Sequence, residues 1–363
     1  MNSHRVIKGI SLSLLLLMAG LLAGCGVIPA TGWSGPTVRD GTVYVGLSKG
    51  GQGKLYALDA TMGSFRWVFP AAEEKKMVGD IYSSPVVVEG TIIFGSSDGK
   101  LYGLDGETGE EIWTFPTGGP IISTPFVQGG VLYIGSCDHK LYAITLGGSV
   151  ERKWAFTTGD KIWADPIVAE DMVYIGSLDG KLYALDEETG IKRWEFEVGG
   201  PIVSSPQVED GLVYFGSFDH NVYAVNARTG EEEWRFTTGD WVWAKPLILG
   251  DTLYIGSFDH KLYALEARTG GERWHFQTGG IIRSAVVAYG GKLLVASGEG
   301  AVYALDAQSG QSLWKAPIAE DRILASPWLA DKILYVSSYE GKLYALDAEM
   351  GQRKWEFPLE EGD

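Results

Sequence analysis

The sequence is poor in several residue types, and each shortage narrows the possible functions. Only two of its 363 residues are cysteine, Cys25 and Cys137, which excludes a disulfide framework. Lys and Arg together number 30 against 46 Asp and Glu, for a formal net charge of −16. Because a phosphate backbone requires a clustered basic surface, this balance disfavours a nucleic-acid partner. The sequence also lacks helical hydrophobic periodicity, which excludes a helical solenoid.

Glycine and aromatic residues are abundant instead. The chain contains 50 Gly and 13 Trp, and 45% of its residues are hydrophobic whereas 21% are charged. This apolar content is sufficient for a core, and the glycine content suits many short strands joined by tight turns. The composition therefore favours an ordered, strand-rich protein over a disordered chain.

The first segment has the features of a secretory signal. Two basic residues precede the apolar run ISLSLLLLMAGLLAG, which is shorter than the ~18 to 20 residues of a membrane span. The run ends in LAGC at residues 22–25, which resembles the lipobox of bacterial lipoproteins and implies acylation of Cys25. We therefore expect a signal peptide over residues 1–24 and a lipidated tether over residues 25–32. The protein is then extracytoplasmic and membrane-anchored, on the periplasmic or cell-surface side.

The remainder of the chain is one unit repeated eight times. A tryptophan returns every 40 or 41 residues after a first interval of 46. It stands at Trp67, Trp113, Trp154, Trp194, Trp234, Trp274, Trp314 and Trp355. A Leu-Tyr or Val-Tyr pair keeps the same spacing. A proline opens most units, at Pro36, Pro85, Pro125, Pro166, Pro206, Pro246 and Pro327, with Val286 at this position in unit seven.

Each unit contains four strand-length apolar runs, A to D, separated by turn sequences such as VEG, SSDGK, DGETG and TGG. In run C, KLYALD, both faces of a strand would be apolar, so both must be covered. Sheets of this kind stack face to face, and repeats of ~40 residues close them into a ring. We therefore predict an all-β fold, an eight-bladed β-propeller of four-stranded antiparallel blades over residues 33–363. Whole blades at both ends predict that blade eight packs on blade one without strand exchange.

The repeat motif YALDAxTGxxxW resembles that of the pyrroloquinoline-quinone (PQQ) type β-propellers. The copies at residues 56–67, 183–194 and 303–314 match it closely, and the resemblance extends over essentially all of the mature chain. One branch of this family consists of quinoprotein dehydrogenases. The other consists of lipid-anchored, non-catalytic scaffolds similar to the outer-membrane β-barrel assembly lipoprotein (BamB-like). The size, the lipobox and the eight nearly bare repeats resemble the second branch.

Membership of the quinoprotein branch would imply a quinone beside a calcium ion held by Glu, Asn and Asp ligands, and an adjacent pair of cysteines. This sequence departs from that pattern. Its asparagines are Asn2 in the signal segment, Asn221 in a hairpin turn and Asn226 at the usual Asp position, and its two cysteines are far apart. We therefore expect no cofactor, with PQQ unlikely to bind, no metal site and no enzyme activity. A PQQ-binding oxidoreductase or sensor is the alternative.

Other motifs with catalytic associations stand in turns. The G-x-S-x-G matches at residues 46–50 and 95–99 lie in B-to-C hairpins, so they do not indicate a nucleophile. His139, His220 and His260 each follow an aspartate at one turn position of three units. Neighbouring blades would hold them too far apart for a shared metal ion, so we interpret them as turn residues in place of glycine. The aspartate that ends run C, as in Asp59, is expected to accept bonds from backbone amides.

The loops of an antiparallel blade emerge on two faces. The D-to-A and B-to-C loops share one, here called the DA/BC face, and the A-to-B and C-to-D loops share the other, the AB/CD face. The only sizeable insertion, residues 71–80, and a lengthened hairpin, residues 47–54, both belong to the DA/BC face. Insertions in repeat arrays collect on the binding face. We therefore expect binding on the DA/BC face.

The units differ most just before run A. Three residues ahead of the proline position the series is Trp33, Tyr82, Ile122, Trp163, Val203, Trp243, Arg283 and Leu324. One residue ahead of it, where Ser or Thr is common, stand Asp165 and Lys245. Exposed aromatics with Arg are typical of interface hot spots. The candidate partner- or ligand-binding residues are Trp33, Tyr82, Trp163, Asp165, Trp241, Trp243, Lys245 and Arg283. The alternative is that the rings cap the central channel.

The expected function is that of a monomeric, lipid-anchored docking scaffold. Its partners would be envelope proteins or peptide segments, in outer-membrane or envelope protein assembly, and the lipid would provide the membrane contact. Binding of a carbohydrate or peptide at the Trp-rich mouth is a further alternative.

Overall fold

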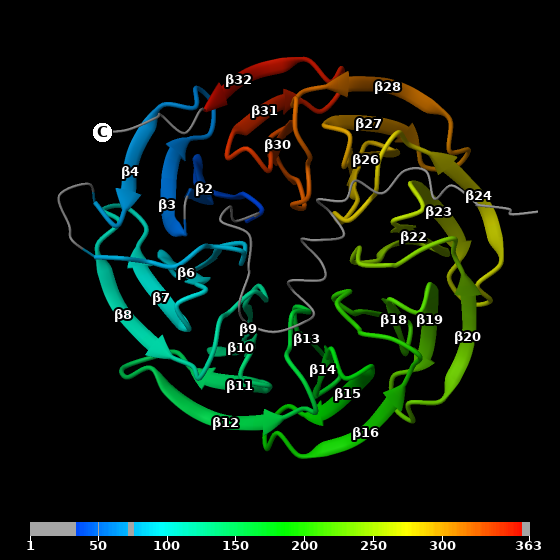
Figure 1. Ribbon diagram of the computed structural model, residues 1–363, viewed down its shortest axis with the longest axis horizontal. Coiled ribbons are helices and arrows are strands. Elements are labelled where there is room, and N and C mark those ends of the chain that lie inside the picture. The colour runs from blue at the N-terminus through cyan, green and yellow to red at the C-terminus, as the bar shows by residue number, and fades with distance from the viewer. Residues whose placement is uncertain (1–33, 50, 72–75, 358–363) are drawn as a thin grey trace, which may run out of the picture.

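The protein is a ring of eight four-stranded antiparallel sheets (Figure 1). The computed structural model describes residues 34–49, 51–71 and 76–357, and every regular element within them is a strand. No helix long and apolar enough to cross a membrane occurs in these ranges. The predicted all-β, eight-bladed propeller is confirmed. The expected signal peptide (1–24), the tether (25–32) with Cys25, and Trp33 lie outside the described residues.

The strands follow the chain in groups of four. The first two blades contain β1 Thr37–Arg39, β2 Thr42–Lys49, β3 Gln52–Asp59, β4 Phe65–Phe69, β5 Val86–Val88, β6 Thr91–Gly95, β7 Lys100–Asp105 and β8 Glu111–Pro116. Blades 3 and 4 contain β9 Phe126–Gln128, β10 Val131–Gly135, β11 Lys140–Thr145, β12 Glu151–Thr157, β13 Ile167–Ala169, β14 Met172–Gly176, β15 Lys181–Asp186 and β16 Lys192–Glu197. Blades 5 and 6 contain β17 Gln207–Glu209, β18 Leu212–Gly216, β19 Asn221–Asn226, β20 Glu232–Thr237, β21 Leu247–Leu249, β22 Thr252–Gly256, β23 Lys261–Glu266 and β24 Glu272–Gln277. The last two contain β25 Val287–Tyr289, β26 Lys292–Ser297, β27 Ala301–Asp306, β28 Ser312–Pro317, β29 Trp328–Ala330, β30 Ile333–Ser337, β31 Leu343–Asp347 and β32 Arg353–Phe357.

Each blade consists of four consecutive strands, with the first strand nearest the axis and the fourth at the rim (Figure 1). The ring closes where blade 8 packs against blade 1. The Tyr335 hydroxyl and the Trp355 indole Nε1 both donate to the carbonyl of Ala60, at 2.9 and 3.2 Å. The Ser337 hydroxyl donates to the carbonyl of Ser34 at 2.8 Å. Closure by packing, without strand exchange, is therefore confirmed.

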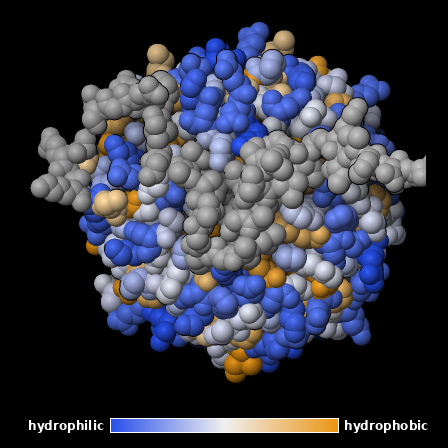
Figure 2. All heavy atoms as spheres, viewed as in Figure 1, coloured by the Kyte–Doolittle hydropathy of each residue, from blue (hydrophilic) through white to orange (hydrophobic). Residues whose placement is uncertain are grey.

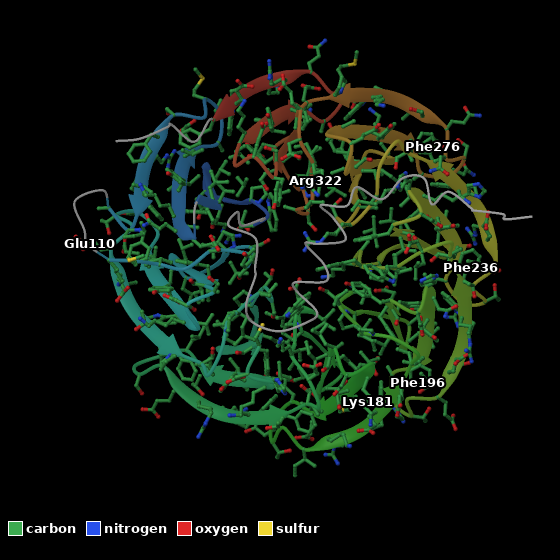
Figure 3. All side chains as sticks on the ribbon, viewed as in Figure 1. Glu110, Lys181, Phe196, Phe236, Phe276 and Arg322 are labelled. Carbon is green, nitrogen blue, oxygen red and sulfur yellow. The ribbon has the colours of Figure 1, made fainter. Side chains whose placement is uncertain are left out.

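Burial in the strands follows the sequence pattern. In β15 the side chains of Leu182, Tyr183, Ala184 and Leu185 are all buried, because neighbouring blades cover both faces of this strand. The rim strands are covered on one face only. In β20 the ring of Trp234 is buried while charged neighbours face solvent, and Figure 3 shows Phe196, Phe236 and Phe276 along the rims of three successive blades.

Tryptophan and glycine join each blade to the next. The Trp234 indole Nε1 donates to the carbonyl of Ala267 in blade 6 at 2.8 Å, and its ring covers Gly270. Gly270 has φ of +72°, and a Cβ there would lie 2.6 Å from the ring, so only glycine fits. The same pairing recurs at Trp67/Gly109, Trp154/Gly190, Trp194/Gly230, Trp274/Gly310, Trp314/Gly351 and Trp355/Gly63.

The aspartate at the end of the third strand stabilises the following turn. Oδ1 of Asp105 accepts bonds from the backbone amides of Glu107 and Thr108, at 3.0 and 2.8 Å. Hydrogen bonds to the backbone and side chain of Thr108 lower the pKa of Asp105. Asp59 binds the amides of Thr61 and Met62 in the same way. The prediction of a structural role is confirmed.

The two loop faces are arranged as predicted. On the DA/BC face, the amide of Gly118 in a D-to-A loop donates to Oδ2 of Asp138 in the next B-to-C hairpin, at 2.8 Å. On the AB/CD face, the amide of Gly106 donates to the carbonyl of Gly90 at 2.8 Å.

The insertion and the lengthened hairpin contact each other on the DA/BC face. The amide of Gly53 donates to the carbonyl of Val78 at 3.0 Å, and the amide of Ile81 donates to the Ser48 hydroxyl at 2.9 Å. A Cβ on Gly53 would lie 2.3 Å from the carbonyl oxygen of Gly79. Residues 78 and 79 of the insertion therefore lie directly against the hairpin of blade 1.

Candidate functional site

Side chains that face the propeller axis form successive levels. Neighbouring side chains alternate in direction in the segment that leads into each first strand, so inward-facing positions are two residues apart. We call the level three residues before the repeat proline the mouth level, and the level one residue before it the belt level. The candidate binding residues in the described part of the chain belong to these levels, apart from Trp241, which stands two residues before Trp243 of the mouth level.

Apolar side chains pack across the axis at the mouth level. One group, here called the mouth cluster, joins residues from seven blades, whereas each other core cluster joins two neighbouring blades. Its members are Tyr82, Ile122, Cys137, Trp163, Val203, Phe218 and Leu324, with Leu178, Trp241, Trp243, Ile281 and Tyr339 partly buried against them. A cluster that draws on nearly every blade lies where the blades meet, at the axis.

Stacked rings make up one side of the mouth cluster. Phe218 and Trp241 are nearly parallel, with centroids 4.5 Å apart. Trp243 stacks with Trp163 at 6.0 Å and with Phe258 at 6.3 Å. Offset stacking at these separations is favourable beyond the burial of the rings. The four rings Trp163, Phe218, Trp241 and Trp243 therefore form a packed unit that links blades 4, 5 and 6.

Arg283 extends this packed unit to blades 7 and 8. Its guanidinium carbon lies 4.1 Å from the centroid of the Trp243 ring, and its Nη1 donates to the carbonyl of Leu324 at 3.1 Å. The side chain is only 9% exposed. Burial lowers the pKa of Arg283 to about 9, and the charge of Asp165 acts in the opposite direction. Arg283 therefore stays charged at neutral pH inside the mouth cluster.

The belt level is a ring of hydrogen bonds between blades, here called the belt. Its residues are Gly35, Ser84, Thr124, Asp165, Ser205, Lys245, Ala285 and Ser326. In five of the eight steps, the backbone amide of one belt residue donates to the side-chain oxygen of the next. These bonds are Gly35 to Ser84 at 3.1 Å, Ser84 to Thr124 at 3.3 Å, Thr124 to Asp165 at 2.6 Å, Asp165 to Ser205 at 3.0 Å, and Ala285 to Ser326 at 3.0 Å.

The belt lacks a side-chain oxygen at three positions. Lys245, Ala285 and Gly35 provide no acceptor for the amides of Ser205, Lys245 and Ser326. Gly35 is required by space, because a Cβ there would lie 2.9 Å from the carbonyl oxygen of Ser326 at the ring closure. Lys245 and Ala285 are adjacent in the ring. They leave one continuous gap between blades 5 and 7.

Asp165 is the carboxylate of the belt. Loss of solvent raises its pKa, while the bond from Thr124 and the positive charge of Lys245 oppose this rise. The negative charge of Asp165 in turn acts to raise the pKa of Arg283 at the mouth level. The inner part of blades 4 to 7 therefore contains two cations, Lys245 and Arg283, and one carboxylate, Asp165.

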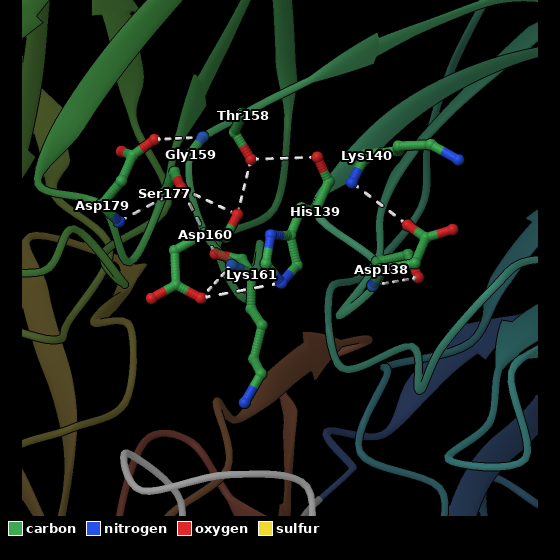
Figure 4. A network of polar contacts seen from close by, with 10 residues as sticks. Asp138, His139, Lys140, Thr158, Gly159, Asp160, Lys161, Ser177 and Asp179 are labelled. Atoms are coloured by element: carbon green, nitrogen blue, oxygen red, sulfur yellow. Dashed lines mark hydrogen bonds and ion pairs between the residues drawn. The ribbon is translucent and has the colours of Figure 1, made fainter.

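Hydrogen bonds between loops hold the mouth in place on the DA/BC face (Figure 4). The Thr158 hydroxyl donates to the carbonyls of His139 and Asp160, at 3.1 and 2.6 Å, and the amide of Gly159 donates to Oδ2 of Asp179 at 2.6 Å. His139 has φ of +70°, like the glycine at this position in other units, which confirms it as a turn residue in place of glycine. Lys161 extends away from this network (Figure 4).

The described candidate binding residues are either buried or half-buried. Tyr82, Trp163 and Arg283 are buried in or against the mouth cluster, and Trp241 and Trp243 are half-buried at its edge. Asp165 and Lys245 lie one level below, in the belt, and are half-buried. The four aromatic candidates, Tyr82, Trp163, Trp241 and Trp243, therefore all belong to the mouth cluster.

Four hairpin residues of the mouth cluster, Cys137, Leu178, Phe218 and Tyr339, were not among the predicted binding residues. They share one position of the B-to-C turn with Phe258, which contacts Trp241 and Trp243. An apolar residue in a turn that is otherwise polar was the available signal. Arg322 stacks on Tyr339 at 4.7 Å and points toward the middle of the ring (Figure 3). On the face shown in Figure 2, hydrophilic residues predominate and hydrophobic ones form small separate groups.

The fold and the packed axis define the class of protein. It is an eight-bladed β-propeller of four-stranded blades, with tryptophan and glycine between the blades and a cluster of apolar side chains at the axis. The chain belongs to the family of the outer membrane protein assembly factor BamB, whose model matches residues 78–164, 148–280 and 259–363.

Solved structures with the same fold include proteins of different function. BamB from Moraxella catarrhalis has 21% sequence identity and a TM-score of 0.69, and the match covers 86% of this chain and 93% of that chain. The computationally designed Ika8 protein has 13% identity and a TM-score of 0.75, with 87% and 96% covered. A europium-containing methanol dehydrogenase has 14% identity and a TM-score of 0.68, with 86% and 81% covered. Comparison with curated protein sequences gave no match.

Proposed function

We propose that the protein is a lipid-anchored, extracytoplasmic scaffold that docks other envelope proteins in outer-membrane protein assembly. Membership of the BamB family carries this proposal. The lipobox at Cys25 supports the membrane anchor. The insertion seated on the hairpin of blade 1 supports the DA/BC face as the docking side, since this is where the repeats depart from one another.

The docking surface we propose is what the mouth cluster leaves accessible on the DA/BC face. Trp241 and Trp243 each keep part of their rings exposed, and Lys161 and Arg322 stand at the position of Trp241 in the D-to-A loops of blades 4 and 8, on the same face. Aromatic and cationic side chains together are typical of residues that dominate binding energies. Tyr82, Trp163, Asp165, Lys245 and Arg283 then position this surface from below, and Trp33 completes the mouth level in sequence.

Charge reversal at the surface tests docking. The double variant Lys161→Glu and Arg322→Glu is expected to lose the envelope protein that co-purifies with the wild-type lipoprotein, with its melting temperature nearly unchanged. Arg268→Glu on the AB/CD face makes the same kind of change and is expected to retain that protein. Equal retention by both variants would contradict docking on the DA/BC face.

We further propose that this propeller works without PQQ and is not an enzyme. A quinone of the dehydrogenase kind requires a planar slot beside a metal ion. Here the ring of Trp243 is covered by the Arg283 guanidinium, 4.1 Å from its centroid, and by the stacked rings of Trp163 and Phe258. The described residues contain no group of three or more His, Cys, Asp or Glu side chains that could hold a metal ion, and Cys137 is their only cysteine. The side chains present do not fit the quinone.

Titration provides a direct test of this second proposal. PQQ added with Ca²⁺ is expected to give no saturable change in quinone absorbance and no alcohol-dependent dye reduction. Stoichiometric binding with calcium dependence would support the oxidoreductase alternative instead.

A further inference from the structure

The gap in the belt contains two amides for which the belt provides no side-chain acceptor. By the register of the five belt bonds, the amides of Ser205 and Lys245 correspond to positions 245 and 285, where Lys and Ala have no side-chain oxygen. Lys245 is half-buried at the belt level, so its ammonium adds a positive charge beside the same gap, and this charge opposes the rise in the pKa of Asp165. An anion with hydrogen-bond acceptors matches such a set of groups.

The belt itself shows how a carboxylate binds at this level. One carboxylate oxygen of Asp165 accepts the amide of Thr124 at 2.6 Å, shorter than the bonds that the hydroxyls of Ser84, Thr124, Ser205 and Ser326 accept. A ligand carboxylate at the belt position of blade 6, two blades after Asp165, would meet the amide of Ser205 and the ammonium of Lys245. The charges present allow it, because the belt and mouth levels contain two cations, Lys245 and Arg283, and one carboxylate, Asp165.

Apolar side chains follow the belt toward the AB/CD face. The first residues of six innermost strands are apolar and keep part of their surface exposed, although all but Trp328 also pack against the cores between blades: Val86, Phe126, Ile167, Leu247, Val287 and Trp328. Trp328 is 41% exposed, although it stands on the innermost strand of blade 8. The mouth cluster covers the other side of the belt. A ligand would therefore enter from the AB/CD face, with its charged group at the belt and an apolar body against these side chains.

We propose that the belt gap at Ser205, Lys245 and Ala285 binds the carboxylate of a ligand that carries an apolar body. The ligand's carboxylate oxygens replace the two missing acceptors and pair with Lys245. This site is separate from the docking surface proposed on the DA/BC face, and it goes beyond the docking function.

Isothermal titration calorimetry on the full-length lipoprotein in detergent tests the site. The probes are octanoate and the peptide acetyl-Ala-Val-Phe with a free carboxyl terminus, each against a neutral partner, octan-1-ol and the same peptide amide. Saturable binding of at least one acid, with binding of its neutral partner about tenfold weaker or undetectable, is expected. Binding of the peptide acid alone would assign the site to chain ends, and binding of octanoate would assign it to small carboxylates.

Substitutions in the belt separate the site from non-specific binding. Lys245→Ser introduces the oxygen that most other blades have, so the ring is expected to fold normally and to lose affinity for the acid by about tenfold. Lys161→Ser removes the same charge on the DA/BC face and is expected to bind like the wild type. No saturable binding of either acid, equal binding of the neutral partners, or unchanged binding by Lys245→Ser would each overturn the proposal.

Discussion

At the residue scale, most of the repeated side chains of this protein join blades to one another. The tryptophan that reveals the repeat covers a glycine of the next blade and donates to a backbone carbonyl there, as Trp234 does with Gly270 and Ala267. The repeated aspartates bind turn amides. The positions that matter for binding are therefore those where one unit differs from its neighbours.

Removing one of these tryptophans should weaken the whole ring. Trp234→Ala is expected to lower the free energy of unfolding by about 3–5 kcal/mol, because it removes a buried ring and a hydrogen bond between blades. Urea denaturation followed by circular dichroism measures this loss. Leu313→Ala, at a side chain that is 50% exposed, is the control and should change stability by less than about 0.5 kcal/mol. Similar effects of the two substitutions would contradict the role of Trp234.

Asp165 should make stability depend on pH with an unusual sign. Its pKa is raised in the folded state, so the folded protein holds this proton more tightly than the unfolded chain does. The contribution of Asp165 is largest below its unfolded pKa of about 3.9 and falls as pH rises through the folded pKa.

The comparison with Asp165→Asn isolates this contribution from the other carboxylates. The stability of the wild type minus that of the variant is expected to decrease as pH rises from about 4 to 7. Urea unfolding at several pH values measures it. A difference that increases with pH would mean that Lys245 and Arg283 outweigh the loss of solvent at Asp165.

At the scale of elements, the strands could be predicted from sequence and the levels at the axis could not. The apolar strand-length runs and the turn residues between them repeat in every unit, so each unit independently predicts the same four strands. The belt depends on which side chain meets the amide of the neighbouring blade, about 40 residues away in sequence. Asp165 and Lys245 stand out in sequence, but only the ring shows that one accepts a belt bond and the other interrupts the belt.

The insertion and the blade 1 hairpin form one element on the DA/BC face, and a single glycine should control their contact. Gly53→Ala places a Cβ against the carbonyl of Gly79, which is 2.3 Å from the ideal Cβ position. In the variant, hydrogen exchange at the amides of residue 53 and Ile81 is expected to be faster by about tenfold or more. The reason is that the added Cβ strains the bonds from these amides to the Val78 carbonyl and to the Ser48 hydroxyl. Exchange in the strands of blade 5 should be unchanged, and a uniform increase throughout the ring would contradict a local effect.

At the scale of the whole molecule, the ring closure resembles every other junction between blades. Trp355 covers Gly63 and donates to Ala60 as Trp234 does in blade 6, although no belt bond spans the closure at Gly35. Trp355→Ala is therefore expected to cost about as much as Trp234→Ala, roughly 3–5 kcal/mol, with a single cooperative transition. Differential scanning calorimetry tests this, and two separate transitions would show that the closure is weaker than the other junctions.

The proposed docking function is tested most directly by photocrosslinking in cells. A photoreactive residue is introduced singly at positions 161, 241, 243 and 322 on the DA/BC face, and at positions 62 and 268 on the AB/CD face, in the full-length lipoprotein. We expect the same envelope protein to be captured at two or more of the DA/BC positions and at neither AB/CD position. Capture only from the AB/CD face, or no specific protein from either face, would contradict the scaffold account.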